Sequence, residues 1–409
     1  LLALLRPEEG EAVTDLVSDS RRAGPGTLFF ALRGLRTDGH RFLQQVADAG
    51  ARAAVVELKD PAVDMLQIEV PDSTRALALA SAYYYETAVE ELPYIAVTGT
   101  AGKTTTSTML ASLLQSLLGP VGLVTTAGIY HPQYTKTDMA NTTPDIITLH
   151  KTVKQLIDLG SSALVIEASS HGIEQQRIGG LPFRYAVFTN LSNEHLDYHK
   201  TMEAYADTKA KLFSDLPADG VAVVNLCDPW TARILAHCQA RVVGFALAED
   251  LALLDETEEG AALLQRCERI LTADQLETTT DGTLNFELSA GGTTVLPVQS
   301  QVIGSFNVNN LLAAAGVALA MGYALEELVG PLEAFTGVTI RRQPRPKSRL
   351  VFALPLGRPV LSLNGAHRAG LAAHHNGLGF DPVRVIPGTA QQVSVGNPGR
   401  CEVAVFGRD

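Results

Sequence analysis

The sequence predicts an α/β protein, with a small N-terminal α/β domain followed by a central domain built on a parallel sheet. Three observations support this prediction. An apolar run over 94–97 leads directly into a glycine-containing turn and then into helix-forming residues. Strand patterns alternate with helical patterns up to about residue 320, as in a sheet covered by helices. Polar clusters follow the predicted strands, at the edge of a parallel sheet where ligands gather.

The glycine turn spans 98–106 and reads Thr-Gly-Thr-Ala-Gly-Lys-Thr-Thr-Thr. Its glycines let the backbone approach phosphate, Lys103 supplies a positive charge, and Thr104 offers a hydroxyl to Mg²⁺. The strict G-x4-G-K-[ST] pattern fails, because its first glycine would fall at Val97. The shorter pattern alone also occurs in ordinary surface turns. With a strand before it and a helix after it, the turn predicts a nucleotide-binding phosphate loop.

Composition limits the class of protein. The chain has 409 residues, 46% of them hydrophobic, and a net charge of −12, which argues against a general nucleic-acid or membrane surface. No apolar run reaches membrane-spanning length, and the apolar start at 1–5 is too short for a secretory signal. The chain begins without Met, so we expect a processed or partial product. Four cysteines have neither disulfide nor zinc spacing, which predicts free thiols in a reducing compartment: Cys227, Cys238, Cys267 and Cys401.

Residues 14–90 have the pattern of the small α/β domain. A polar cluster at 18–22 precedes Pro25-Gly26 and by itself would be an ordinary turn. The predicted elements that follow are a strand at 27–32, a turn at 33–39, a helix at 40–50, a strand at 53–56 and a helix capped near Asp72 that runs through Tyr85.

The central domain alternates strands and helices. The predicted strands are 94–98, 163–167, 185–191, 220–224 and 241–245. Beyond them, an acidic stretch at 249–259 is predicted as an exposed loop or helix, and 284–298 as a hairpin. Residues 304–310 open a long apolar helix. The asparagines there either cap the helix or contact a purine edge, and spacing does not separate these two interpretations.

Polar residues at the strand ends are the candidate site. Glu167 ends one predicted strand and His195 follows another. A single residue of this kind is more often structural. Four predicted strands end in polar stretches, however, and four such ends around one phosphate loop favour groups that hold Mg²⁺ beside a triphosphate. The four stretches are the glycine turn, 167–172, 189–199 and 225–228. Lys209, on a helix predicted over 202–212, would reach the site only if that helix returns over it. Otherwise it is an ordinary solvated lysine.

Together these clusters resemble the Mur ligase family, and within it the MurE type (UDP-N-acetylmuramoyl-tripeptide synthetase). The resemblance covers about 14–338. Its carriers are Asp19-Ser20-Arg21 with Thr37-Asp38-Gly39, the loop 99–105, Asn141-Thr142-Thr143-Pro144, the stretch 167–172 with Gln175 and Arg177, His195-Leu196-Asp197-Tyr198-His199, Lys209, and 304–310.

The resemblance implies a fold and a reaction. Residues 1–90 would bind the UDP end of the substrate, and 91–338 would be the central ATP-binding domain. The reaction is ATP-dependent amide formation in peptidoglycan precursor synthesis. The γ-phosphate passes to the D-Glu carboxylate of UDP-MurNAc-L-Ala-D-Glu, and the amine of a diamino acid, L-Lys or meso-diaminopimelate, attacks the acyl phosphate. The family also implies a cytoplasmic monomer with no nucleic-acid or membrane partner.

The resemblance also implies roles for individual residues. Lys103, Lys209 and His195 would be catalytic, and Lys209 would be carbamoylated. The other implied groups are Gly99, Thr100, Gly102, Lys103, Thr104 and Thr105 for ATP phosphates, Asn307 and Asn310 for adenine, Ser20 for uridine, Asn141, Thr142, Thr143, Ser169, Gln175 and Arg177 for the muramoyl-peptide, and Thr104, Glu167, His195 and Lys209 for Mg²⁺.

The sequence departs from the family pattern in three places. Ala101 replaces the loop's usual Asn, and Glu194 replaces the usual Asp before His195. After Val338 the family continues with Pro-Gly-Arg and a Rossmann-like C-terminal domain, whereas here Pro-Gly-Arg comes only at 398–400. The intervening stretch 339–397 is basic and rich in Pro and Gly, which predicts a poorly ordered foreign insertion, or alternatively a real arm that binds an acidic partner.

On this interpretation 398–409 is the start of a truncated C-terminal domain that is otherwise absent. We therefore expect this chain alone to bind nucleotide weakly and not to turn over. Two alternatives stay open. A folylpolyglutamate synthase shares the architecture, but Ser20 and 141–144 argue against it. A non-catalytic scaffold of the plastid type, located in the stroma, is favoured by the missing domain. It is opposed by the intact Lys103, Glu167, His195 and Lys209.

Overall fold

The structure is a computed structural model that describes residues 2–5, 12–34, 37–137, 141–194, 196–291 and 294–337, together with the backbone of two strands at 391–394 and 402–405. The chain divides into two compact units, 1–341 and 342–409. In the second unit, β16 (Gln391–Ser394) and β17 (Glu402–Val405) pair as antiparallel strands. The remainder of 339–409 lies outside the described residues, so the predicted insertion and C-terminal start stay predictions.

The N-terminal part contains a parallel four-stranded sheet in the order β1-β2-β3-β4. The predicted strand at 53–56 is confirmed, and the cap before the third helix is confirmed by the Asp72 carboxylate, which accepts a hydrogen bond from the Arg75 amide. The polar cluster at 18–22 includes a 3-10 turn. The elements are α1 (Leu2–Leu5), β1 (Asp15–Val17), η1 (Ser20–Arg22), β2 (Thr27–Phe30), η2 (Gly39–Phe42), α2 (Leu43–Asp48), β3 (Ala53–Val56), β4 (Gln67–Glu69) and α3 (Ser73–Tyr84).

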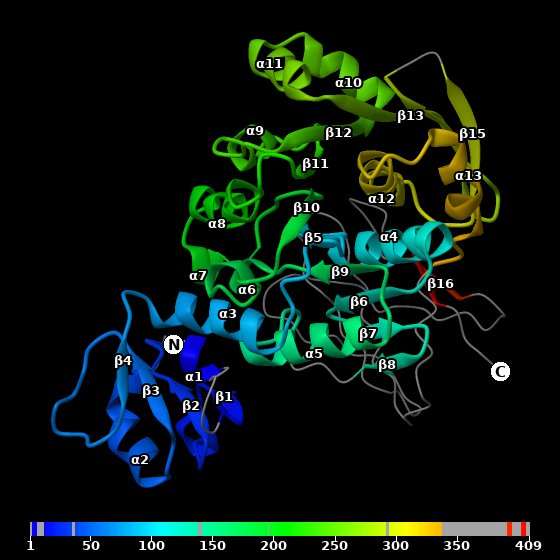
Figure 1. Ribbon diagram of the computed structural model, residues 1–409. Helices are drawn as coiled ribbons and strands as arrows, with labels where there is room; N and C mark the ends of the chain where they lie inside the picture. The colour runs from blue at the N-terminus through cyan, green and yellow to red at the C-terminus, as the bar shows by residue number, and fades with distance from the viewer. Residues whose placement is uncertain are drawn as a thin grey trace. The chain divides into compact units, whose positions relative to one another are not determined.

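The central sheet has eleven strands, in the order β15-β14-β13-β12-β11-β10-β5-β9-β6-β7-β8 (Figure 1). The run from β13 to β6 is parallel, which confirms the predicted parallel sheet. Antiparallel strands extend it at both edges. The strands are β5 (Tyr94–Thr98), β6 (Val121–Thr125), β7 (Gly128–His131), β8 (Tyr134–Lys136), β9 (Ala163–Glu167), β10 (Phe183–Phe188), β11 (Val221–Asn225), β12 (Arg241–Leu247), β13 (Arg269–Thr278), β14 (Leu284–Ala290) and β15 (Val295–Ser300).

Helices cover both faces of this sheet. Ile95 and Val97 of β5 belong to a core with α4, α12 and α13, whereas Tyr94 and Ala96 belong to a second core with α5 and α8. Because β5 is buried on both faces, its sequence is continuously apolar. The helices are α4 (Lys103–Leu118), α5 (Ile146–Asp158), α6 (Ser170–Glu174), α7 (Leu196–His199), α8 (Met202–Ser214), α9 (Thr231–Ile234), α10 (Ala248–Asp255), α11 (Glu258–Arg266), α12 (Asn307–Ala320) and α13 (Leu325–Ala334).

Some predicted bounds differ from the structure. The strand expected over 185–191 is β10, which ends at Phe188, because Thr189 and Asn190 leave the sheet and bond to the glycine loop. The acidic stretch at 249–259 lies within two short helices, α10 and α11. The hairpin β14–β15 is confirmed.

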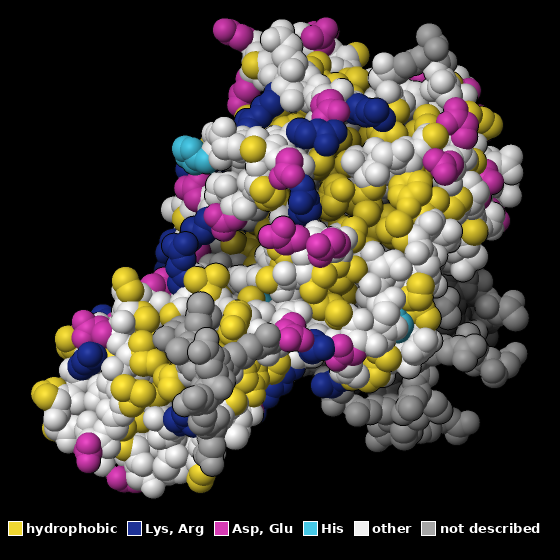
Figure 2. All heavy atoms as spheres, in the orientation of Figure 1, with side chains coloured by type: hydrophobic (Ala, Val, Ile, Leu, Met, Phe, Trp, Pro, Cys, Tyr) yellow, Lys and Arg dark blue, Asp and Glu magenta, His cyan; other side chains and the backbone are white. Residues whose placement is uncertain are grey.

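Surface and thiol chemistry agree with the composition. Three cysteines in the described part of the chain, Cys227, Cys238 and Cys267, are free thiols. On the face shown in Figure 2, acidic and basic side chains are interspersed instead of gathering in a patch of one sign. Among the described residues, no helix is both long enough and apolar enough to cross a bilayer.

Candidate nucleotide and substrate site

The glycine loop connects β5 to the N-terminus of α4, and its shape requires glycine at two positions. Gly99 has φ +149°, and a Cβ there would lie 1.9 Å from Thr189 Oγ1. Gly102 is left-handed, with φ +81°, and a Cβ there would lie 2.5 Å from Asn310 Oδ1. Helix α4 begins at the next residue, Lys103, with no side-chain cap. Amides at such a helix start are suited to binding phosphate.

The segment after β10 is hydrogen-bonded to this loop. The Asn190 side chain accepts a hydrogen bond from the Ala101 amide (2.9 Å) and donates one to the Ala101 carbonyl (3.0 Å). Thr189 Oγ1 donates to the same carbonyl at 2.7 Å, and the Thr100 amide donates to the Asn190 carbonyl at 2.8 Å. Asn190 was not among the predicted site residues. A polar side chain near the end of the strand predicted over 185–191 was the only signal in the sequence.

Two lysines converge on the loop. Lys103 Nζ donates to the carbonyls of Gly99 (3.1 Å) and Thr100 (2.8 Å). Helix α8 returns over the loop, so that Lys209 Nζ also donates to the Gly99 carbonyl, at 2.8 Å. Lys209 is 1% exposed, and its Nζ lies 4.6 Å from the centroid of the Tyr205 ring. The structure therefore brings both lysines together, as the sequence interpretation required.

Burial lowers the pKa of both lysines. It lowers the pKa of Lys209 well below the usual range, and the nearby positive charge of Lys103 lowers it further. Burial also lowers the pKa of Lys103, although the Glu167 and Glu194 carboxylates act in the opposite direction. Lys209 is thus held in a place that favours a neutral amine.

Glu167 lies at the end of β9 and is 1% exposed. Its Oε2 accepts hydrogen bonds from Thr104 Oγ1 and from the Thr126 amide, both at 2.9 Å, and its Oε1 accepts one from Thr126 Oγ1 at 3.0 Å. Thr126 follows β6, a strand that the sequence analysis did not identify, so it was missed.

The oxygen atoms of Thr104 and Glu167 have the chemistry that Mg²⁺ prefers. In the described ranges, no group of three or more His, Cys, Asp or Glu side chains is arranged to hold a metal ion. His195, the third predicted ligand, lies outside the described residues. The Thr104 hydroxyl and the Glu167 carboxylate therefore fit part of a magnesium site.

The asparagines at the start of α12 are bonded to each other and to α4. Asn310 Oδ1 accepts from Thr106 Oγ1 at 2.9 Å, and its Nδ2 donates to Asn307 Oδ1 at 2.9 Å. Asn307 Nδ2 donates to the Ile303 carbonyl at 2.8 Å. These bonds fix α12 to the phosphate-loop helix. Each Nδ2 uses one of its two N–H groups in these bonds, and the contact with adenine stays a prediction.

A cleft of about 800 Å³ is lined by residues from both the N-terminal and the central part of the chain. The predicted residues Asn141, Gln175 and Arg177 line it. Ser18 lines it where Ser20 was expected, and the Ser20 hydroxyl lies 3.5 Å from Gln45 Oε1. The other polar residues of the cleft wall are Arg33, Thr37, Thr74, Asp145, Glu174, Gln176 and Tyr198.

Hydrogen bonds connect this cleft to Glu167. The Arg177 guanidinium donates to the Thr143 carbonyl at 2.8 Å, and Thr143 Oγ1 donates to the Glu167 carbonyl at 3.0 Å. Thr126 Oγ1 lies 3.0 Å from Thr142 Oγ1. Ser169 Oγ caps α6 and lies 3.0 Å from Thr143 Oγ1. Four of the predicted peptide-binding residues, Thr142, Thr143, Ser169 and Arg177, therefore belong to a hydrogen-bonded wall between the cleft and Glu167.

Comparison with known families agrees with this geometry. A model described as the Mur ligase middle domain matches residues 97–318, and one described as the Mur ligase family, catalytic domain, matches 13–85. The chain belongs to the Mur ligase family. This confirms the family resemblance drawn from the sequence motifs.

Within the family, the chain is similar to enzymes named UDP-N-acetylmuramoyl-L-alanyl-D-glutamate–2,6-diaminopimelate ligase. It is 34% identical over 330 residues to the one from Geobacter metallireducens, covering 78% of this chain and 60% of the relative. It is 36% identical over 349 residues to the one from Chlorobium phaeobacteroides, covering 81% and 63%. The chain thus spans somewhat less than two thirds of these curated relatives.

Solved structures show the same fold. A ligase structure of that same name superimposes with a TM-score of 0.67 at 27% identity, covering 86% of this chain and 68% of the other. MurF from Acinetobacter baumannii gives a TM-score of 0.53 at 24% identity, covering 82% and 67%.

Proposed function

We propose that this chain carries the ATP-binding and UDP-substrate-binding parts of an ATP-dependent amide ligase of peptidoglycan precursor synthesis. The enzyme would add a diamino acid to UDP-MurNAc-L-Ala-D-Glu. The observation that carries the proposal is the hydrogen-bonded wall between Arg177 and Glu167, which joins a cleft of substrate size to the phosphate loop. The names of the curated relatives support the substrate, and make 2,6-diaminopimelate the first diamino acid to test.

The proposed first step transfers the γ-phosphoryl group of ATP to the substrate carboxylate. A carboxylate oxygen forms a bond to the γ-phosphorus. The bond between the γ-phosphorus and the oxygen that bridges it to the β-phosphate breaks, and ADP leaves. Two anions must approach each other, so positive charge from Lys103 and Arg177 is the main contribution of the protein. Thr104, Glu167 and His195 would hold Mg²⁺, which would supply further positive charge. The diamino-acid amine then attacks the acyl carbon and forms the amide bond. The bond from that carbon to the phosphate oxygen breaks, phosphate leaves, and the amine releases one proton to solvent.

Lys209 is proposed to act after it has reacted with CO₂. Its burial and the neighbouring Lys103 favour the neutral amine, which is the form that can take up CO₂. A bond forms between Nζ and the carbon of CO₂, and the nitrogen releases one proton to solvent. The product is an anionic carbamate whose oxygen atoms suit Mg²⁺. In the described structure the free amine donates to the Gly99 carbonyl, which holds it at the loop.

We also propose that the protein works in the cytoplasm as a monomer, without a nucleic-acid or membrane partner. The net charge of −12 supports the absence of a nucleic-acid or membrane partner, because polyanions and anionic membranes would repel the protein. The free thiols support a reducing compartment.

Calorimetric titration of the full chain tests the proposal in two separate parts, with MgATP and with UDP-MurNAc-L-Ala-D-Glu. We expect Lys103→Ala to weaken MgATP binding more than about tenfold while leaving binding of the dipeptide substrate unchanged. We expect Arg177→Ala to do the reverse.

Arg184→Ala is the matched control for Arg177, because Arg184 lies outside the substrate cleft and pairs with Asp219. It should change neither affinity. Absence of binding of UDP-MurNAc-L-Ala-D-Glu to the wild-type chain, or equal MgATP affinity in wild type and Lys103→Ala, would overturn the proposal.

A further inference from the structure

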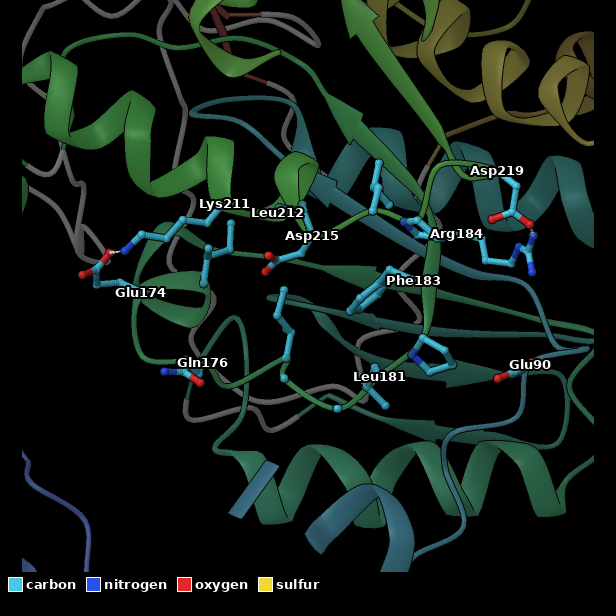
Figure 3. Close-up of a pocket in the computed structure, with 17 residues that line it drawn as sticks. Glu90, Glu174, Gln176, Leu181, Phe183, Arg184, Lys211, Leu212, Asp215 and Asp219 are labelled. Atoms are coloured by element: carbon cyan, nitrogen blue, oxygen red, sulfur yellow. Dashed lines mark hydrogen bonds and ion pairs between the residues drawn. The ribbon is translucent and has the colours of Figure 1, made fainter. Parts of the chain in front are cut away.

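A second cleft, of about 690 Å³, lies between the segment 173–184 and the C-terminal half of α8 (Figure 3). It shares Glu174 and Gln176 with the wall of the substrate cleft, but the residues to which the ligase proposal gives a role in catalysis or binding do not line it. Much of its wall is apolar, and the apolar side chains are Ile173, Ile178, Leu181, Pro182, Phe183, Leu212, Leu216 and Pro217. Its volume falls in the range of sites that bind small organic molecules.

Most of the charges in this cleft are paired. Lys211 Nζ lies 2.8 Å from Glu174 Oε2, and Arg184 pairs with Asp219. The Lys211–Glu174 pair is reinforced by Thr208 Oγ1, which donates to the same Glu174 oxygen at 3.0 Å. Both cations that line the cleft are therefore already engaged with carboxylates.

Two carboxylates in the cleft lack such partners. Within the described part of the chain, neither Asp215 nor Glu90 has a side-chain hydrogen bond or ion pair. Figure 3 shows the Asp215 carboxylate directed into the space between Leu212 and Phe183. Asp215 is an exposed residue, but partial burial of its carboxylate raises its pKa, and the positive charges of Arg75 and Lys211 partly oppose this rise. The cleft thus presents two carboxylates without a directly bonded cation beside apolar side chains.

We propose that this cleft binds a small organic cation, namely a primary amine on an apolar body of about the size of one aromatic ring. The ammonium group pairs with Asp215, and the apolar body packs against Phe183 and Leu212. Because α8 also carries Lys209, the bound amine contacts the helix that reaches the phosphate loop. This inference does not depend on the proposed ligase activity.

Two probes of equal shape test it. Phenethylamine carries the positive charge, and 2-phenylethanol is its neutral counterpart. Titrations of the full chain, followed by NMR signals of the probe, give a dissociation constant for each. We expect the amine to bind about fivefold more tightly than the alcohol, as for one partly exposed charge pair. Asp215→Asn should abolish this preference, and Phe183→Ala should weaken both probes together.

Glu203→Gln is the matched control, because it removes the same charge from the exposed side of α8, outside the cleft. It should leave the preference for the amine unchanged. The proposal is overturned if neither probe binds, if both bind equally to the wild type, or if Asp215→Asn retains the preference. Because no nucleotide is present, this result is independent of the MgATP titration.

Discussion

His150 shows how one buried residue makes stability depend on pH. Its ring is fully buried, with Nδ1 2.5 Å from Thr87 Oγ1 and Nε2 3.0 Å from the Gly179 carbonyl. Because a carbonyl only accepts, Nε2 carries the proton and Nδ1 accepts from the Thr87 hydroxyl. Burial lowers the pKa of His150 to about 4, with the Gly179 bond acting weakly against this. The folded protein therefore holds a neutral imidazole.

This arrangement predicts a loss of stability in acid. Between pH 6.5 and about 4 the unfolded chain binds a proton at His150 that the folded chain does not. The free energy of unfolding should therefore fall as pH falls through this window, by about 3 kcal/mol in total from this group. Urea unfolding of wild type and His150→Gln at several pH values measures it. The stability gap between the two proteins should narrow towards pH 4, and a constant gap would contradict the prediction.

Gly99 gives a second prediction at this scale. A methyl group there would lie 1.9 Å from Thr189 Oγ1, on a residue with φ +149°. Gly99→Ala should therefore lower the free energy of unfolding by about 3 kcal/mol and abolish MgATP binding. Gly330→Ala in α13 is the control, because no atom lies within 4 Å of the place its methyl group would take, and it should be neutral or slightly stabilising. Equal stability of the two variants would show that the loop tolerates a side chain.

At the scale of elements, the phosphate loop depends on the segment that follows β10. Two side-chain bonds from Asn190 hold Ala101, so the loop is shaped before a ligand arrives. Asn190→Ala should weaken MgATP binding about fivefold to tenfold, which corresponds roughly to the free energy of one hydrogen bond. The free energy of unfolding should change little. Asn193→Ala, exposed on the same segment, should bind like wild type. Calorimetric titration with MgATP measures these affinities. Equal affinity of wild type and Asn190→Ala would show that Asn190 does not contribute to nucleotide binding.

The same elements show what sequence patterns can and cannot predict. The strand at 163–167 and the helix that opens near Asn307 were predictable, because burial on both faces and apolar periodicity leave a direct record in the residues. Thr126 and Asn190 were not, since their roles depend on which strands become neighbours. The approach of Lys209 to Gly99 likewise depends on the direction of α8, which is a property of packing and not of local sequence.

At the scale of the whole molecule, the first unit is joined by a shared core. Ile146 and Ile147 of α5 are buried with Leu28, Phe30 and Leu77 of the N-terminal part. Lys151 of α5 also pairs with Asp15 of β1. A helix of the central part therefore contributes side chains to the hydrophobic core of the N-terminal sheet. We expect the two sheets to unfold together.

This predicts that two probes of unfolding report one transition. Fluorescence of Trp230, the only tryptophan in the chain, follows the central part, and far-ultraviolet circular dichroism follows both. Ile147→Ala should lower the free energy of unfolding measured by both probes equally, by about 2–4 kcal/mol. Leu79→Ala, at a side chain that is 58% exposed, should shift neither appreciably. Separated transitions in the Ile147→Ala variant would mean that the two sheets fold independently.

The long sequence separations around the phosphate loop have a consequence for biosynthesis. The loop's partners lie 89 residues further along the chain at Asn190 and 110 at Lys209, and Asn310 lies 204 residues beyond Thr106. A ribosome therefore releases the loop long before it makes the residues that give the loop its shape. Nucleotide cannot assist the early nascent chain, and chains arrested before residue 310 should emerge without a competent pocket.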